Sequence, residues 1–364
     1  MVGPTHTVRW STVQPWRGLF AFAVTFFLAL VITVSCSIDN YLGMTAIWII
    51  CMVPIQLIVD IGWGCQYPPT GFLPQPWRGM ALTAFVGLVG TVVAFAIVHL
   101  AGTHVAHPYL SVFVIFVVVT TIIVTTNFSL WPFDTCTVPV RGMIWAVLAP
   151  VIVFFIIKLL NFSYLSFVPG APGPVPFYKG GIPLPAPTTG PIPWECDFAW
   201  FMWLAFLSFT WVMLDFWPFN RVPGLMKQPV LGFTVLSTNC VLSLVIYQVG
   251  TRGLGLEPLD LLYCGISYAF GLLTVLVVFQ KWPGRLIGGL GGNLLDLLLA
   301  IMVAVVAYHA TNVVCAWHFG RLPYPQKIFT SATFMLGLNF PLWVAYCDFW
   351  QMWPLPSGEA ATTE

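Results

Sequence analysis

Long apolar segments with almost no charge are the feature that most constrains how this chain can fold. Only 7% of its 364 residues are charged, whereas soluble domains carry about 25%. A helix needs about 20 apolar residues to cross about 30 Å of hydrocarbon. Ten segments meet this condition, with uncertain boundaries, at 18–37, 43–63, 80–102, 109–130, 142–162, 196–217, 230–250, 259–280, 286–311 and 328–350. The sequence therefore predicts a multi-pass integral membrane protein, most simply of the cell membrane.

These segments are expected to be helices. Backbone groups in lipid must be hydrogen-bonded within the protein, and a membrane strand would alternate polar and apolar residues. The run from Val112 to Val124 is rich in β-branched residues, which favour strands in water, but it shows no alternation. The predicted fold class is all-α, with about ten transmembrane helices.

The ends of these segments repeat. Even-numbered segments end on tryptophan, usually followed by proline, at Trp63, Trp131, Trp217, Trp282 and Trp350. Odd-numbered segments begin after a proline, and the clearest copies continue with Arg17-Gly18, Arg78-Gly79 and Arg141-Gly142. The pattern predicts about five tandem helical hairpins. Internal duplication explains it, and so does independent selection, because proline suits helix starts while Trp and Arg suit the membrane interface.

The hairpins place all these Trp-Pro and Arg-Gly corners on one side of the membrane, the corner side. Eight basic residues map to it: Arg9, Arg17, Arg78, Arg141, Arg221, Lys227, Lys281 and Arg285. The opposite side holds Lys179, Arg252, Arg321 and Lys327, with Lys158 near the end of its helix. Basic residues concentrate on the cytoplasmic side of membrane proteins, so we predict that both termini are cytoplasmic.

This topology divides the chain into five parts. They are a cytoplasmic segment 1–16, helices one to five at 17–162, an extracytoplasmic loop at 163–194, helices six to ten at 195–351, and a cytoplasmic tail 352–364. The loop contains nine prolines, which favours extended polyproline-like structure. It is expected to act either as a lid or as a passive linker or subunit contact.

Polar residues inside the segments are the candidates for function, because a membrane makes them costly. Four carboxylates lie near the cytoplasmic ends, and two amides lie deeper: Asp60, Asp215, Asp296, Asp348, Asn239 and Asn339. One hypothesis pairs the carboxylates with nearby arginines as structural ion pairs. The other makes one or more of them a proton or cation site on a substrate path that the amides also line.

Histidines give an alternative. Five of the six map to the side opposite the corners: His99, His104, His107, His309 and His318. Neutral imidazoles that face each other can bind haem iron or copper. Their spacing matches no strong metal signature, and histidine is also tolerated at membrane interfaces.

Other classes of function have little support in the sequence. Thirteen basic and 12 acidic residues give no basic surface for nucleic acid, and no nucleotide-binding or hydrolase motif is present. The leading hypothesis is a transporter or channel-like permease for a small solute. The alternative is a membrane redox or metal-dependent enzyme subunit that holds haem or copper. A scaffold subunit, a homo-oligomer and a subunit of a membrane complex also remain open.

Overall fold

The computed structural model describes residues 14–42, 46–100, 108–160, 162–163, 165–166, 175–176, 192–324 and 326–355. Within them, eight helices are long and apolar enough to cross a membrane, and two shorter apolar helices span Trp48–Gly62 and Val112–Asn127. This confirms a helical, multi-pass membrane protein. The expected helix through Val112–Val124 is confirmed, since α5 (Pro108–Ile122) continues into the π-helical turn η4 (Ile123–Asn127).

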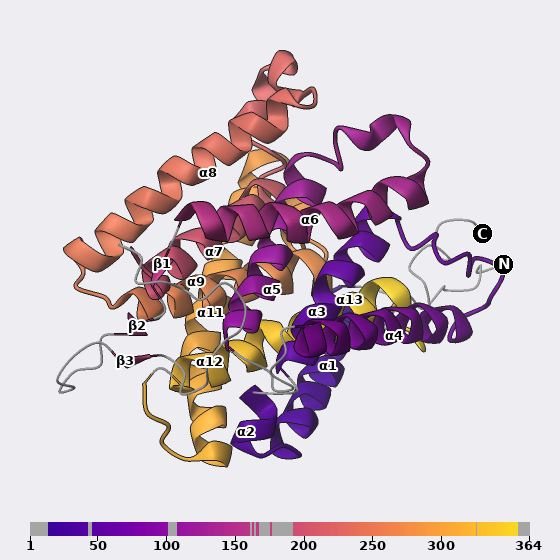
Figure 1. Cartoon of the computed structure of the whole chain (residues 1–364). Helices are drawn as coiled ribbons and strands as arrows, with labels where there is room; N and C mark the ends of the chain where they lie inside the picture. The colour runs from indigo at the N-terminus through magenta and orange to yellow at the C-terminus, as the bar shows by residue number, and fades with distance from the viewer. Residues whose placement is uncertain are drawn as a thin grey trace, which may run out of the picture.

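Long helices alternate along the chain between outer and inner positions. The outer helices are α1 (Trp16–Val34), α4 (Trp77–Leu100), α6 (Val138–Leu160), α8 (Val230–Gln248) and α11 (Gly289–Phe319). In each outer span 28% of the residues are buried, whereas the three longer inner spans have between 61% and 78% buried. Figure 1 shows α4 and α8 at the edges, with α5 and α9 between them.

The inner helices are α3, α5, α7, α9 and the broken helix α12–α13. Their bounds are Ala46–Leu57, Pro108–Ile122, Trp194–Met213, Pro258–Leu273, and Gln326–Ala332 with Phe340–Val344. Each packs against the next, and α13 packs back against α3, so they form a closed ring. Each outer helix packs on the preceding inner helix: α4 on α3, α6 on α5, α8 on α7, α11 on α9, and α1 on α13.

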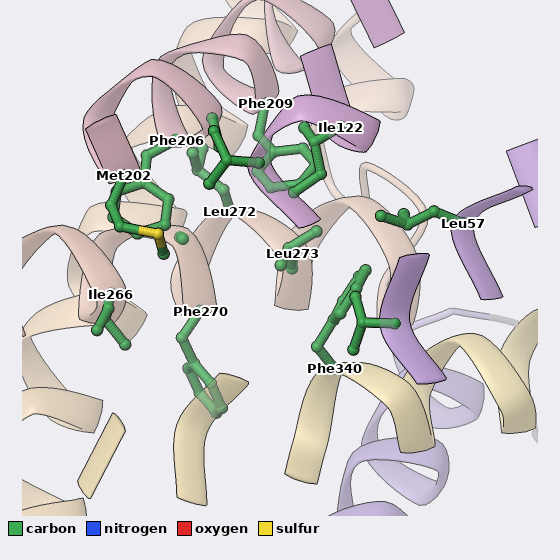
Figure 2. Packing of buried hydrophobic residues seen from close by; sticks show 14 of the residues in the cluster. Leu57, Ile122, Met202, Phe206, Phe209, Ile266, Phe270, Leu272, Leu273 and Phe340 are labelled. Atoms are coloured by element: carbon green, nitrogen blue, oxygen red, sulfur yellow. The ribbon is translucent and has the colours of Figure 1, made fainter. Parts of the chain in front are cut away.

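Apolar side chains fill the middle of this ring. Leu57, Ile122, Phe209, Leu273 and Phe340, one from each inner helix, are all buried in a single hydrophobic cluster. Figure 2 shows them packed together. Lipid and protein interior are equally apolar, so membrane helices gain little from burial alone. Close packing of these side chains therefore contributes more to holding the helices together than their removal from lipid does.

Most inner helices end on the corner side in a widened π-helical turn followed by a left-handed pair of residues. The π turns there are η3 (Ile58–Gly62), η4, η9 (Thr274–Val278) and η11 (Ala345–Phe349), and α7 lacks one. The positive-φ pairs are Gly64-Cys65, Ser129-Leu130, Asp215-Phe216, Gln280-Lys281 and Gln351-Met352. The Trp-Pro bonds that follow at Pro132, Pro218, Pro283 and Pro354 are cis.

Glycines let the outer helices approach these ends closely. An added Cβ would lie 2.7 Å or less from an aromatic side chain at each contact, which joins Gly18 to Phe279, Gly79 to Trp350, Gly142 to Trp63, and Gly232 to Phe128. Four of the five outer helices, α1, α4, α6 and α8, thereby touch the second inner helix back in the cyclic order. The glycine of the predicted Arg-Gly corner is thus a packing residue.

Glutamines that precede three of these outer helices hydrogen-bond to the same inner helix ends that the glycines contact. The Nε2 atoms of Gln14, Gln75 and Gln228 donate to the backbone oxygens of Val278, Phe349 and Asn127. The Oε1 atoms of the first two accept the backbone N–H groups of Gly18 and Gly79. Helix ends leave four carbonyls without partners, and these amides satisfy some of them.

Short elements complete the described chain. They are α2 (Ile38–Asn40), α10 (Gly284–Ile287), η10 (Thr333–Asn339) and η8 (Val249–Gly253), and the 3₁₀ turns Phe133–Thr135, Phe219–Arg221 and Pro223–Met226. Two-residue strands β1 (Phe162–Ser163) and β4 (Ile192–Pro193) pair in parallel, while β2 (Leu165–Ser166) and β3 (Val175–Pro176) pair antiparallel. The rest of the proline-rich loop lies outside the described residues, so its lid role stays a prediction.

Candidate functional site

Asp215, one of the predicted path residues, forms a structural tie. Its Oδ1 accepts a hydrogen bond from Lys281 Nζ at 2.8 Å, and its Oδ2 accepts one from Asn293 Nδ2 at 2.8 Å. Partial desolvation opposes ionisation, but these bonds and the Lys281 charge hold the pKa of Asp215 below its usual value. The residue joins the end of α7 to the start of α11, where no glycine–aromatic contact exists.

Asp296 joins two helical pieces through one carboxylate oxygen, while its other oxygen, Oδ2, is buried without a hydrogen-bond partner among the described residues. It is fully buried, and its Oδ1 accepts the backbone N–H of Gly284 at 2.8 Å. Gly288 between them has φ +72° and separates α10 from α11. The glycine-rich run therefore breaks the helix, and Asp296 holds the two pieces together.

Asn239 locks an outer helix onto an inner one. Its Oδ1 accepts from Trp211 Nε1 at 2.6 Å, and its Nδ2 donates to Leu204 O and Ser208 Oγ at 3.1 Å each. Ser208 Oγ also accepts from Asn127 Nδ2 at 3.0 Å. All the polar atoms of the Asn239 side chain are satisfied at the interface between α7 and α8, away from the centre of the ring.

Replacing Asn239 with leucine is expected to destabilise the protein by about 2 kcal/mol, because three interhelical hydrogen bonds at about 0.6 kcal/mol each are lost. Thermal unfolding in detergent should show a melting temperature several degrees lower. Thr238→Val is the matched control, since Thr238 bonds only within its own helix, to Thr234 O. Equal melting of both variants would contradict the role of Asn239 as a lock.

Asn339 occupies the π-helical segment of the last inner helix. It is fully buried, and its Nδ2 donates to Phe334 O at 2.7 Å, while its Oδ1 has no hydrogen-bond partner among the described residues. Gln56 on α3 resembles it, because its Nε2 donates to Pro341 O at 2.8 Å and its buried Oε1 also lacks a partner there. Two buried acceptor oxygens therefore lack a hydrogen-bond partner among the described residues at the contact between α3 and the broken helix α12–α13. We call this contact the seam.

Asp60 and Asp348 lie at the corner-side end of this same seam. Asp60 is in η3 and Asp348 is in η11, and the two half-buried carboxylates are close enough to interact electrostatically. Cys65 Sγ lies 3.5 Å from Asp60 Oδ1. Burial raises the pKa of the Cys65 thiol to about 12, so the thiol stays protonated and donates to the carboxylate. The seam therefore gathers Asp60, Asp348, Gln56 and Asn339.

The other repeats carry no acid at the matching positions. Asp348 stands two residues before Trp350 and Asp60 three residues before Trp63, the residues that follow their helix ends. At the same two positions before Phe128, Leu214 and Phe279 stand Thr126 and Thr125, Val212 and Trp211, and Val277 and Leu276. Only the first and last helix ends place a carboxylate there. The seam between α3 and α12–α13 therefore departs from the repeated pattern of the other helix ends.

The predicted ring of acid–arginine pairs is wrong for the part of the chain that the structure describes. There the one ion pair joins Asp215 to a lysine. Arg17, Arg78 and Arg141 each leave a buried Nε without a hydrogen-bond partner in that part, and Arg78 Nη2 donates instead to Cys65 O at 3.1 Å. At these helix starts, glycine lets the backbone of an outer helix lie against an aromatic ring of an inner helix. The contact therefore needs no carboxylate.

Within the described residues, the structure does not bring the histidines of the alternative hypothesis together as a group of metal ligands. His99 on α4 and His309 on α11 are both exposed on outer helices. His318 Nε2 lies 3.1 Å from Cys36 O, and its ring packs beside Phe319. His104 and His107 lie outside the described residues. No group of three potential metal ligands occurs within the described ranges.

Sequence reasoning missed Gln56 and also Asp197, which is buried in the first turns of α7. Gln56 resembles the other amides inside segments and could have been included on that basis. Asp197 follows the proline-rich loop directly and stands at the edge of the predicted segment 196–217.

Comparison of the chain with protein families, curated proteins and solved structures found no match in any of the three.

Proposed function

We propose that this chain is a permease for a small solute, with ten spans in five tandem hairpins and both termini in the cytoplasm. Its solute passes along the seam between α3 and α12–α13. The carboxylates of Asp60 and Asp348 bind the proton or cation that drives the movement. The site lies at the cytoplasmic end of that seam in the proposed orientation.

The observation that carries this proposal is the meeting of Asp60 and Asp348. They come from opposite ends of the sequence, and no ion pair joins either to a basic residue in the described part of the chain. Removing a charge from water without a partner is costly. Two neighbouring carboxylates disfavour each other's ionisation, and a proton or a cation bound beside them would relieve this.

The unpartnered amide oxygens support a path along this seam. Buried polar atoms almost always have a hydrogen-bond partner, and Gln56 Oε1 and Asn339 Oδ1 lack one within the described structure. A solute with N–H or O–H groups would supply it. Asn239, whose bonds are all made, has no such capacity. The apolar layer around Leu57 and Phe340 closes the path, so movement of the solute requires the inner helices to shift.

Proton movement into reconstituted vesicles tests the function. Purified protein is placed in vesicles loaded with a pH-sensitive dye, and sugars, amino acids, organic acids and amines are added singly outside. At least one solute should change the internal pH in vesicles with protein and leave empty vesicles unchanged. The proposal fails if folded protein moves neither protons nor sodium with any of these solutes.

A further inference from the structure

Three arginines on the corner side have hydrogen-bond donors that the protein does not use. Arg17, Arg78 and Arg141 are half-buried, and the Nε of each is covered and lacks a partner among the described residues. Arg78 Nη2 donates to Cys65 O. Arg17 and Arg141 make no hydrogen bond or ion pair within the described ranges, and their Nη atoms remain accessible. A guanidinium has five N–H donors, so each of the three still has donors for a partner outside the chain.

The fourth corner shows that this position needs no arginine for packing. Leu231 stands directly before Gly232, as each of the three arginines stands directly before its glycine, and it is 6% exposed. Gly232 nevertheless lies against the ring of Phe128, as the other glycines lie against theirs. A leucine thus fills the same position in a corner that makes the same contact. The charge at the other three corners therefore serves something other than this contact.

Exposed apolar side chains flank each of these arginines. The residues directly before them are Trp16, Trp77 and Val140, the residues two positions after them are Leu19, Met80 and Met143, and all six are between 40% and 59% exposed. Tryptophan favours the interface between lipid and water. A long basic side chain there covers apolar surface with its stem and keeps its charge in the polar layer. The groups within its reach in that layer are lipid headgroups.

We propose that each of these three corners binds the phosphate of one anionic phospholipid, held by Arg17, Arg78 or Arg141. A planar guanidinium matches phosphate oxygens with two parallel N–H donors, and the acyl chains lie along the exposed face of the outer helix. A zwitterionic lipid carries its own ammonium group near the phosphate, so its net attraction to the arginine is smaller. The proposal does not depend on solute transport, so failure of the permease function would leave it standing.

Native mass spectrometry of the full-length protein in detergent tests this binding. The protein is incubated with phosphatidylglycerol or with phosphatidylcholine of the same acyl chains, and the bound lipids are counted. The wild-type protein should bind phosphatidylglycerol at least about fivefold more tightly, equivalent to about 1 kcal/mol for one basic residue near an anionic surface. Inorganic phosphate at constant ionic strength should not displace the lipid, because it lacks the acyl chains.

The variant Arg17→Leu/Arg141→Leu copies the fourth corner at the two arginines that make no hydrogen bond within the described ranges. Each altered corner should bind phosphatidylglycerol about fivefold more weakly. Arg252→Leu/Arg321→Leu is the matched control, because it removes the same charge beyond the opposite ends of α8 and α11. The control should bind the lipid like the wild-type protein.

Three results would overturn the proposal. They are equal binding of both lipids by the wild-type protein, displacement of phosphatidylglycerol by inorganic phosphate, and equal affinity of the corner variant and its control. The first two comparisons use wild-type protein alone, so the test stands even if the corner variant does not fold.

Discussion

Replacing Gly271 with alanine is expected to lower the free energy of unfolding by at least about 3 kcal/mol. A Cβ at this position on α9 would lie 2.0 Å from Ala300 O and 3.0 Å from Ala304 N of α11. Both atoms belong to backbone, so no side-chain rotation relieves the contact and the helices must separate. Overpacking of side chains costs about 1–3 kcal/mol, and a backbone clash should reach at least the top of that range. Proteins are stable by only about 5–15 kcal/mol.

Gly87→Ala is the matched control. Gly87 lies in the outer helix α4, where an added Cβ meets nothing within 4 Å. Alanine favours a helix over glycine by about 1 kcal/mol, so this variant should be as stable as the wild-type protein or slightly more. Size-exclusion chromatography and thermal unfolding in detergent give the comparison. If Gly271→Ala melts with the control, α9 and α11 do not approach as closely as described.

Removing either carboxylate of the seam is expected to lower solute-driven proton movement roughly 100-fold, equivalent to about 2.7 kcal/mol in rate. Asn has nearly the same shape as Asp but carries no titratable proton, so Asp60→Asn and Asp348→Asn stop the coupled step and leave the fold intact. The double variant should be no slower than either single variant, because residues that act as a unit are not additive. Initial rates in dye-loaded vesicles give these values.

Asp215→Asn is the control for these substitutions. It makes the same chemical change at an acid whose side chain is 64% exposed and paired with Lys281, so transport should stay near the wild-type rate. Additive losses in the double variant would mean that the two carboxylates work separately. If Asp215→Asn lowers the transport rate as much, the losses in Asp60→Asn and Asp348→Asn come from lower stability of the protein.

The sequence was sufficient to predict the membrane class and the corner motifs. Segment length and the shortage of charge decide the class, because lipid excludes other solutions for backbone hydrogen bonds. The Arg-Gly corners recur in the structure as close contacts at Gly18, Gly79 and Gly142. What they touch was not predictable, since each glycine meets a ring that is distant in sequence.

The division into outer and inner helices could not be predicted. Helices in water reveal their buried face by periodicity, but here lipid and core are both apolar. The roles of the polar residues depended on the same packing. Asn239 and Asn339 look alike in sequence, yet one has all its bonds made between α7 and α8, and the other leaves its Oδ1 unpaired among the described residues.

Solute exchange measured beside solute accumulation tests the coupling role of Asp60 and Asp348 most directly. Vesicles containing the Asp60→Asn/Asp348→Asn protein are given a solute that the wild-type protein accumulates under a pH gradient. The account predicts that the double variant still exchanges labelled for unlabelled solute at equal pH, while accumulation driven by the gradient is lost. Accumulation at the wild-type level by the folded double variant would contradict the account.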